Sequence, residues 1–174
     1  MTIVQKIHHV AYRCKNAKET VLWYKKYLDM DFVLAIAENE VPSTKDPDPY
    51  MHIFLDAGQG NVLAFFELPT QPTMGFDPNT PRWTQHLAMK VNSVDTLLQV
   101  KERLEKDGIE VIGPTDHTLF KSIYFFDPSG HRLELAADTN TPEMQTKLDE
   151  VKWAMLEEWD QTKKAPSHAA WLHQ

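Results

Sequence analysis

The order of predicted secondary structure occurs twice along the chain, and this internal repeat limits the possible folds more than any other feature. Strand-like runs over residues 3–12 and 84–91 are each followed by a helical pattern, over 16–30 and 93–108. Three further strand-like runs follow each helix, over 31–38, 50–57 and 61–68 in the first half and over 109–114, 121–127 and 131–137 in the second. The sequence therefore predicts two tandem βαβββ units.

Start and stop signals support both helices. Asn16 is a plausible N-cap with Glu19 as its capping-box partner, while Ser93 caps the second helix and Gly108 follows its end. The last two strand-like runs, over 121–127 and 131–137, are joined by Asp127-Pro128-Ser129-Gly130, which predicts a tight hairpin turn.

Composition restricts the partners of the chain. With 174 residues, 42% of them hydrophobic, it can bury a sizeable core in one domain. The net charge of −7, with acidic and basic residues mixed, argues against nucleic acid and against an anionic membrane surface. The single cysteine, Cys14, rules out an intramolecular disulfide, and no signal peptide or membrane-length apolar run is apparent. We therefore expect a cytoplasmic protein that binds a small molecule.

The chain outside the repeat divides into a linker and a C-terminal segment. Residues 69–81 are rich in Pro, Thr, Asn and Asp, which indicates a linker. Thr141 and Pro142 begin a helical pattern whose apolar stripe consists of Met144, Leu148, Val151, Met155 and Trp159. We expect a domain over 1–140, with modules at about 3–68 and 82–138, and a C-terminal amphipathic helix and tail over 141–174. This helix packs on the domain or on a dimer partner, or it forms a lid over the site.

Polar residues fall at matching places when the two halves are aligned. His9 pairs with His86 and Glu67 with Glu134, each near the centre of a predicted strand with apolar neighbours. If the repeats pack about a pseudo-twofold axis, these side chains converge in one cavity. Two buried carboxylates repel each other and lose hydration, and a divalent cation removes both penalties. The ligand set suits Fe(II), Mn(II), Zn(II), Ni(II) or Co(II) better than calcium or magnesium.

Three segments, "IHHVAY", "QHLAMKV" and "YFFDPSGHRLELA", carry a resemblance over about residues 5–137. They resemble the vicinal oxygen chelate superfamily, which includes glyoxalase I, extradiol ring-cleaving dioxygenases, methylmalonyl-CoA epimerase, and fosfomycin- and bleomycin-resistance proteins. The resemblance implies an α+β fold in which paired βαβββ modules form a cupped mixed sheet around one metal ion. It also implies bidentate chelation of vicinal substrate oxygens and a homodimer.

The extradiol dioxygenases are the first candidate within this superfamily. The resemblance implies that His9, His86 and Glu134 hold Fe(II) and leave three octahedral positions for a catecholic substrate and dioxygen. Tyr124 matches an active-site tyrosine of these enzymes, and His117 lies near the position of a supporting histidine. Asn61 stands near the place of their acid–base histidine, which makes it a candidate substrate-binding residue.

A glyoxalase I-like lyase or isomerase, acting on a thiol adduct or a 2-oxo compound, is the alternative. The resemblance then implies four metal ligands, His9, Glu67, His86 and Glu134, with Glu67 or Glu134 as the base. Arg13 matches an arginine that contacts glutathione in that family. A binding or resistance protein without turnover is the third hypothesis. Glu67 separates the first two, because a metal-bound Glu67 favours the lyase and a Glu67 that turns away favours the dioxygenase.

Overall fold

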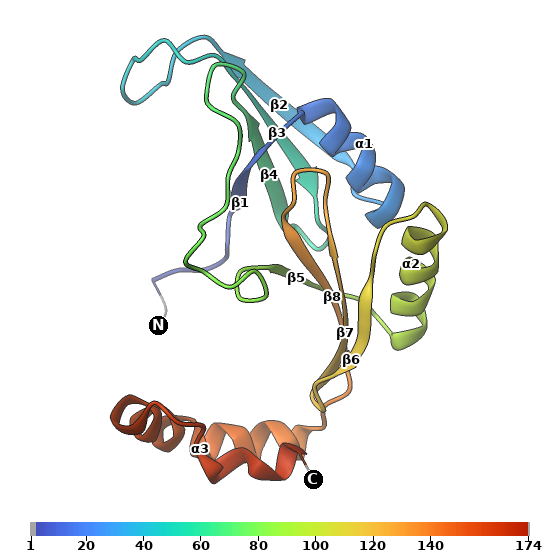
Figure 1. Cartoon of the computed structure of the whole chain (residues 1–174), viewed down its shortest axis with the longest axis vertical. Coiled ribbons are helices and arrows are strands. Elements are labelled where there is room, and N and C mark those ends of the chain that lie inside the picture. The colour runs from blue at the N-terminus through green and yellow to red at the C-terminus, as the bar shows by residue number, and fades with distance from the viewer. Residues whose placement is uncertain (1–2, 174) are drawn as a thin grey trace.

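A computed structural model describes residues 3–173 and contains two βαβββ units in succession (Figure 1). The first comprises β1 (Val10–Cys14), α1 (Ala17–Leu28), β2 (Phe32–Glu38), β3 (Tyr50–Asp56) and β4 (Val62–Glu67). The second comprises β5 (Leu87–Lys90), α2 (Val94–Lys106), β6 (Ile112–Asp116), β7 (Phe120–Phe126) and β8 (Arg132–Asp138). Helix α3 (Pro142–Thr162) and the 3-10 helix η1 (Ser167–His173) follow. The α+β class and the repeated element order predicted from the sequence are confirmed.

Each unit forms its own four-stranded mixed sheet. The strand orders are β1-β4-β3-β2 and β5-β8-β7-β6, with the first strand of each unit parallel to the last. Helices α1 and α2 lie side by side on one side of the two sheets (Figure 1). The sheets bury alternate side chains against these helices, including Leu63, Phe65, Ile123, Phe125 and Leu133. The opposite face of the second sheet carries buried polar residues, among them Ser122 and Glu134.

The first strand of each unit is shorter than predicted. Strand β1 begins at Val10, opposite Leu63, and β5 begins at Leu87, opposite Leu133. Their partners β4 and β8 start only after the hairpin turns at 57–61 and 127–131, so earlier residues have no strand to pair with. His9 and His86 therefore precede their strands directly instead of lying at strand centres.

The predicted helix caps are present. Asn16 Oδ1 accepts a hydrogen bond from the Glu19 backbone N–H at 2.8 Å, and Ser93 Oγ accepts one from the Thr96 N–H at 3.1 Å. Thr141 Oγ1 does the same for the Met144 N–H at 3.3 Å, with Pro142 in the first helical turn. These side chains satisfy backbone donors that have no partner inside a helix.

The hairpin turn between β7 and β8 joins the second module to the first. The buried Asp127 carboxylate accepts hydrogen bonds from the Tyr24 hydroxyl at 3.1 Å and from the His131 backbone N–H at 2.8 Å. Ser129 Oγ accepts a hydrogen bond from the Lys15 N–H, and His131 Nε2 lies 2.7 Å from the Arg13 carbonyl oxygen. The predicted tight turn is thus also one of the contacts that hold the two modules together, beside those of α1 with α2.

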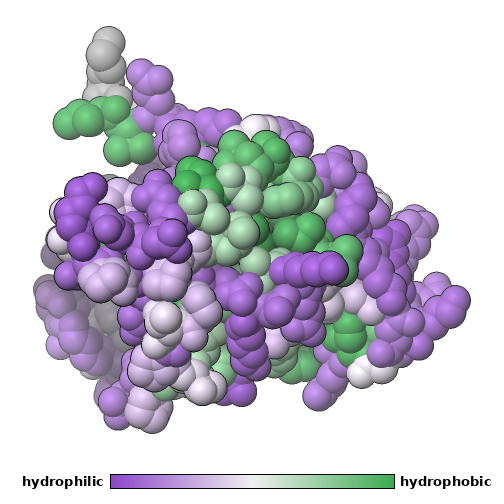
Figure 2. All heavy atoms as spheres, turned by 90° about the horizontal axis from the view of Figure 1, so that it is seen from above, coloured by the Kyte–Doolittle hydropathy of each residue, from purple (hydrophilic) through white to green (hydrophobic). Residues whose placement is uncertain are grey.

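Two elements leave apolar surface uncovered. No residue of α3 is buried, and the helix extends away from the sheets with Trp153, Leu156 and Trp159 exposed (Figure 1). Every residue of the edge strand β2 is exposed, including Phe32, Leu34 and Ile36. Figure 2 shows hydrophobic side chains gathered on one face among hydrophilic ones. Of the alternatives for α3, packing on its own domain is not seen, and no helix within residues 3–173 is long and apolar enough to cross a bilayer.

The contact around Asp127 between the two modules, here called the seam, gives a stability prediction. Tyr24→Phe leaves Asp127 Oδ2 buried without the phenol, so we expect the free energy of unfolding to fall by about 1–3 kcal/mol in urea denaturation. Tyr12→Phe is the matched control, because no hydrogen bond of the Tyr12 hydroxyl is seen among the described residues. Equal stability of Tyr24→Phe and the parent protein would show that this hydrogen bond does not hold the seam.

Candidate metal centre

A buried carboxylate lies at the centre of the second sheet. Glu134 is 3% exposed and stands opposite Tyr124 in the antiparallel pairing of β7 with β8. Its Oε1 accepts hydrogen bonds from Ser122 Oγ and, at 3.2 Å, from Tyr124 Oη. Because side chains alternate along a strand, Leu133 and Leu135 face the helices while Glu134 faces the other side. The sequence thus places a charged group on the inner face without disturbing the core.

His86 meets the second oxygen of this carboxylate. Its Nε2 lies 2.8 Å from Glu134 Oε2, and its Nδ1 lies 3.2 Å from the Thr84 carbonyl oxygen. A carbonyl oxygen can only accept, so Nδ1 donates to it and Nε2 is the nitrogen that faces the carboxylate. Two lone pairs this close require a cation between them, either a proton or a metal ion. The imidazole–carboxylate pair therefore fits one edge of a transition-metal site.

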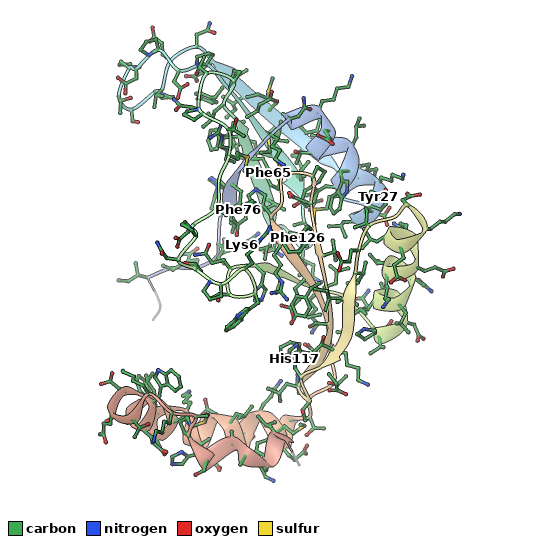
Figure 3. All side chains as sticks on the ribbon, viewed as in Figure 1. Lys6, Tyr27, Phe65, Phe76, His117 and Phe126 are labelled. Carbon is green, nitrogen blue, oxygen red and sulfur yellow. The ribbon has the colours of Figure 1, made fainter. Side chains whose placement is uncertain are left out.

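Tyr124 and His117 extend the polar set. His117, in the turn between β6 and β7 (Figure 3), has its Nε2 2.9 Å from Tyr124 Oη. Burial and the Glu134 charge raise the pKa of Tyr124, so its phenol keeps its proton and can donate to Oε1. The structure thus brings four of the sequence-predicted site residues into one continuous hydrogen-bonded set: His86, His117, Tyr124 and Glu134.

His9 belongs to a different cluster on the first module. Its Nδ1 lies 2.8 Å from His8 Nδ1, and its ring centroid is 6.2 Å from that of His52 and 5.8 Å from that of Phe54. Within residues 3–173, no three His, Cys, Asp or Glu side chains come close enough together to hold a metal ion. One chain therefore assembles two of the three ligands predicted for a dioxygenase.

Glu67 is the last residue of β4, and its carboxylate reaches the N-terminus of α1 on the helix side of the sheet. Its Oε2 accepts a hydrogen bond from the Ala17 backbone N–H at 2.6 Å, where the positive end of the helix dipole stabilises a carboxylate. The sheet register also corrects the proposed equivalence with Glu134. Val10 opposes Leu63 as Leu87 opposes Leu133, so Ala64 is the counterpart of Glu134. Glu67 lies an odd number of residues after Ala64, and because side chains alternate along a strand it faces the opposite side of the sheet.

Arg13 and Asn61, the predicted substrate-binding residues, have structural partners. Arg13 Nη2 donates to the carbonyl oxygen of Pro72 at 2.7 Å, which ties the segment after β4 to β1. Asn61 Nδ2 donates to the Gly58 carbonyl oxygen at 2.9 Å and closes the turn between β3 and β4. A role for either residue in substrate binding stays a prediction.

Ser122 and His52 were missed by the sequence analysis. Both lie two residues before an aromatic residue on the third strand of their units, and the register makes His52 the counterpart of Ser122. The His52 ring is buried and stacks on Phe66 with centroids 3.6 Å apart, and burial lowers its pKa. Its Nε2 has no hydrogen-bond partner in the described part of the chain. The sequence signal for Ser122 and His52 was their position two residues before Tyr124 and Phe54, which places them on the same face of the strand as these aromatic residues.

Residues 6–135 match the sequence profile of the Glyoxalase/Bleomycin resistance protein/Dioxygenase superfamily. The chain belongs to this superfamily. The match covers both βαβββ units up to Leu135 and ends before α3, in agreement with the resemblance found in the sequence. Membership in the superfamily is compatible with several reactions, so the reaction has to be argued from the site.

Individual relatives agree with this membership. A Bacillus subtilis (strain 168) protein named "Putative ring-cleaving dioxygenase MhqA" is 27% identical over 138 residues, which are 78% of this chain and 41% of that protein. The chain thus spans about two fifths of the length of that relative. The structure of a glyoxalase family protein from Enterococcus faecalis is 28% identical with a TM-score of 0.56, covering 78% of this chain and 99% of its own. The fosfomycin resistance protein FosX from Mesorhizobium loti, 19% identical with a TM-score of 0.57 over 83% and 98% of the two chains, shares the fold.

The two glutamates should respond differently to the same substitution. We expect Glu134→Gln to weaken Fe(II) binding by at least about tenfold, because it removes the charge that faces His86. Glu67→Gln should leave Fe(II) binding unchanged and lower the free energy of unfolding by about 0.3–1 kcal/mol, through loss of charge at the α1 N-terminus. Anaerobic metal titration and urea denaturation measure both. Weakened metal binding in Glu67→Gln would return this residue to the ligand set.

Proposed function

We propose that this protein is an Fe(II)-dependent, extradiol-type ring-cleaving dioxygenase of a catecholic substrate. The observation that carries the proposal is the hydrogen bond from the Ala17 N–H to the Glu67 carboxylate. Because this bond holds the carboxylate at the N-terminus of α1, Glu67 is left out of the proposed ligand set. The ligand set is then His9, His86 and Glu134. Three protein ligands leave room for a bidentate diol and dioxygen, whereas four would leave only two positions.

The residues around Glu134 have distinct roles in this proposal. A bound Fe(II) ion would supply Lewis acidity and the redox chemistry of dioxygen. Glu134 and His86 would hold the ion, and Ser122 fixes the carboxylate rotamer through its hydrogen bond to Oε1. Tyr124 keeps its proton and can donate it toward a substrate oxygen. His117 Nε2 lies 2.9 Å from Tyr124 Oη and can return a proton to the phenol.

The relatives support the dioxygenase more than the lyase. The 27%-identical Bacillus subtilis protein carries a ring-cleaving dioxygenase name, and the similarity covers 78% of this chain. A glyoxalase-like lyase would need Glu67 as a ligand or base, and this carboxylate accepts a hydrogen bond on the helix side of its sheet. A binding protein without turnover would not need the relay from His117 through Tyr124 to Glu134.

We further propose that the protein is a homodimer in which His9 of a second copy completes the site. The seam inside one chain is fixed by buried hydrogen bonds around Asp127, so its own His9 stays with His52 on the first module. The apolar edge strand β2 and the exposed aromatic face of α3 are uncovered surfaces that a second copy can bury.

Oxygen uptake tests the reaction. After anaerobic loading with Fe(II), we expect consumption of dioxygen and catechols in equal molar amounts, with a ring-opened product. Tyr124→Phe should lower kcat about 100-fold or more while metal content is retained, because the phenol proton is lost. Absence of uptake, together with isomerisation of a glutathione hemithioacetal by the Ni(II) or Zn(II) form, would establish the lyase instead.

Mixing two inactive variants tests the shared site. We expect His9→Ala and Glu134→Gln each to lose metal and activity, and their mixture, after partial unfolding and refolding, to regain about a quarter of the parental sites as expected for random pairing. Each mixed dimer then holds one intact set of His9, His86 and Glu134. The control mixture is His86→Ala with Glu134→Gln, which restores nothing because both residues come from the same chain. No recovery in the first mixture, with dimers formed, would place each site within one chain.

A further inference from the structure

A cavity of about 520 Å³ opens beside His86, between the segment 74–87 and the turn that joins β7 to β8. Phe76 closes one side by packing on Gly130, where a Cβ would approach the Phe76 ring to 2.7 Å. Gly130 also has a φ of +89°, so both the backbone and the packing require glycine there. The segment after the first module, predicted as a plain linker, thus forms a wall next to the candidate metal centre.

Two arginines line this cavity, and neither guanidinium has a hydrogen-bond partner within residues 3–173. The Arg82 guanidinium lies 4.7 Å from the Phe76 ring centroid and 4.9 Å from that of Phe126, two rings labelled close together in Figure 3. The Arg132 guanidinium lies 4.3 Å from the Tyr124 ring centroid. Stacking on rings uses the flat faces of a guanidinium and leaves its N–H edge free for an anion.

Neither arginine is neutralised within residues 3–173. Ion pairs there use other cations, and Arg132 Nε is buried without a hydrogen-bond partner. The acidic residue of the cavity wall is Asp77, whose carboxylate accepts hydrogen bonds from the Asn79 N–H and Thr80 Oγ1. Leaving the buried Arg132 Nε without a partner is costly, and an anion in the cavity would satisfy it.

The cavity and the candidate metal centre share a wall. Arg132 precedes Glu134 by two residues on β8 and therefore faces the same side of the sheet. It stacks on Tyr124, whose hydroxyl donates to Glu134, and His86 lines the cavity. A molecule whose oxygens reach His86 would extend into the cavity that Arg82 and Arg132 line.

We infer that the substrate is an anion, an aromatic diol bearing a carboxylate or another acidic group that Arg82 and Arg132 bind in this cavity. This inference rests on the proposed function for the diol and on the cavity alone for the anion. Arginine presents a planar pair of N–H groups that matches a carboxylate in bidentate geometry. Phe76 and Phe126 would flank the aromatic ring or its side chain.

Binding of a matched ligand pair tests the inference. We expect Fe(II)-loaded protein, kept anaerobic, to bind 3,4-dihydroxyphenylacetate about tenfold or more tightly than its neutral methyl ester. Arg132→Gln and Arg82→Gln should each bring the ratio of the two dissociation constants toward one. Arg103→Gln, which alters a surface pair with Asp29 away from the cavity, should keep the parental ratio. Equal binding of acid and ester by the parent protein, or an unchanged ratio in Arg132→Gln, would overturn the inference.

A second ligand pair separates this inference from the proposed function. Benzoate and benzyl alcohol have no vicinal oxygens, and without Fe(II) the benzoate carboxylate has no metal ion to bind, so their difference in binding to the metal-free protein reports the anion site alone. Arg132-dependent preference for benzoate without oxygen uptake on any catechol would sustain the anion site and refute the dioxygenase. Ring cleavage of acid and ester with the same kcat/KM, unaffected by Arg132→Gln, would sustain the dioxygenase and refute the anion site.

Discussion

The burial of one carboxylate, Glu134, governs the inner face of the second module. At 3% exposure it would be strongly destabilising unless each oxygen met a donor or a cation. Ser122 and Tyr124 satisfy Oε1, and His86 faces Oε2 with a proton or a metal between them. The orientation of His86, the protonation of Tyr124 and the placement of His117 all follow from this one requirement. The chemistry proposed for the protein grows from the same set.

The two modules share their fold but not the polar residues of the candidate metal centre. Where the second module has Glu134, Tyr124 and Ser122, the register places Ala64, Phe54 and His52 in the first. The helix-facing positions keep similar apolar residues, such as Leu63 and Leu133, because both modules bury them against a helix. In the proposed site Glu134 is the one carboxylate ligand, so the inner face of the first module need not supply another. Glu67 is then free to stabilise the start of α1.

The contact between the modules explains why one chain keeps His9 apart from the other two proposed ligands, His86 and Glu134. Asp127 draws the turn between β7 and β8 against α1 and β1, and this contact fixes the seam on the helix side. The apolar surfaces of β2 and α3 stay open in the same arrangement. A second copy that covered them would bury hydrophobic area and could bring His9 to Glu134 of its partner. Stability, assembly and chemistry would then depend on the same contact.

The sequence by itself determined the element order and the helix caps, and its family resemblance indicated the superfamily and the candidate residues His86, Glu134, Tyr124 and His117. Those features rest on local patterns: caps at Asn16 and Ser93, period-two alternation around Glu134, and short motifs. Only the tertiary structure decided the starts of β1 and β5, because a strand begins where its partner begins. It also decided the face of Glu67, since a shift of one residue in register reverses a side chain, and register depends on long-range pairing. The cavity beside His86 was equally beyond the sequence, because Arg82 and Arg132 line one cavity only when residues 74–87 fold over a distant turn.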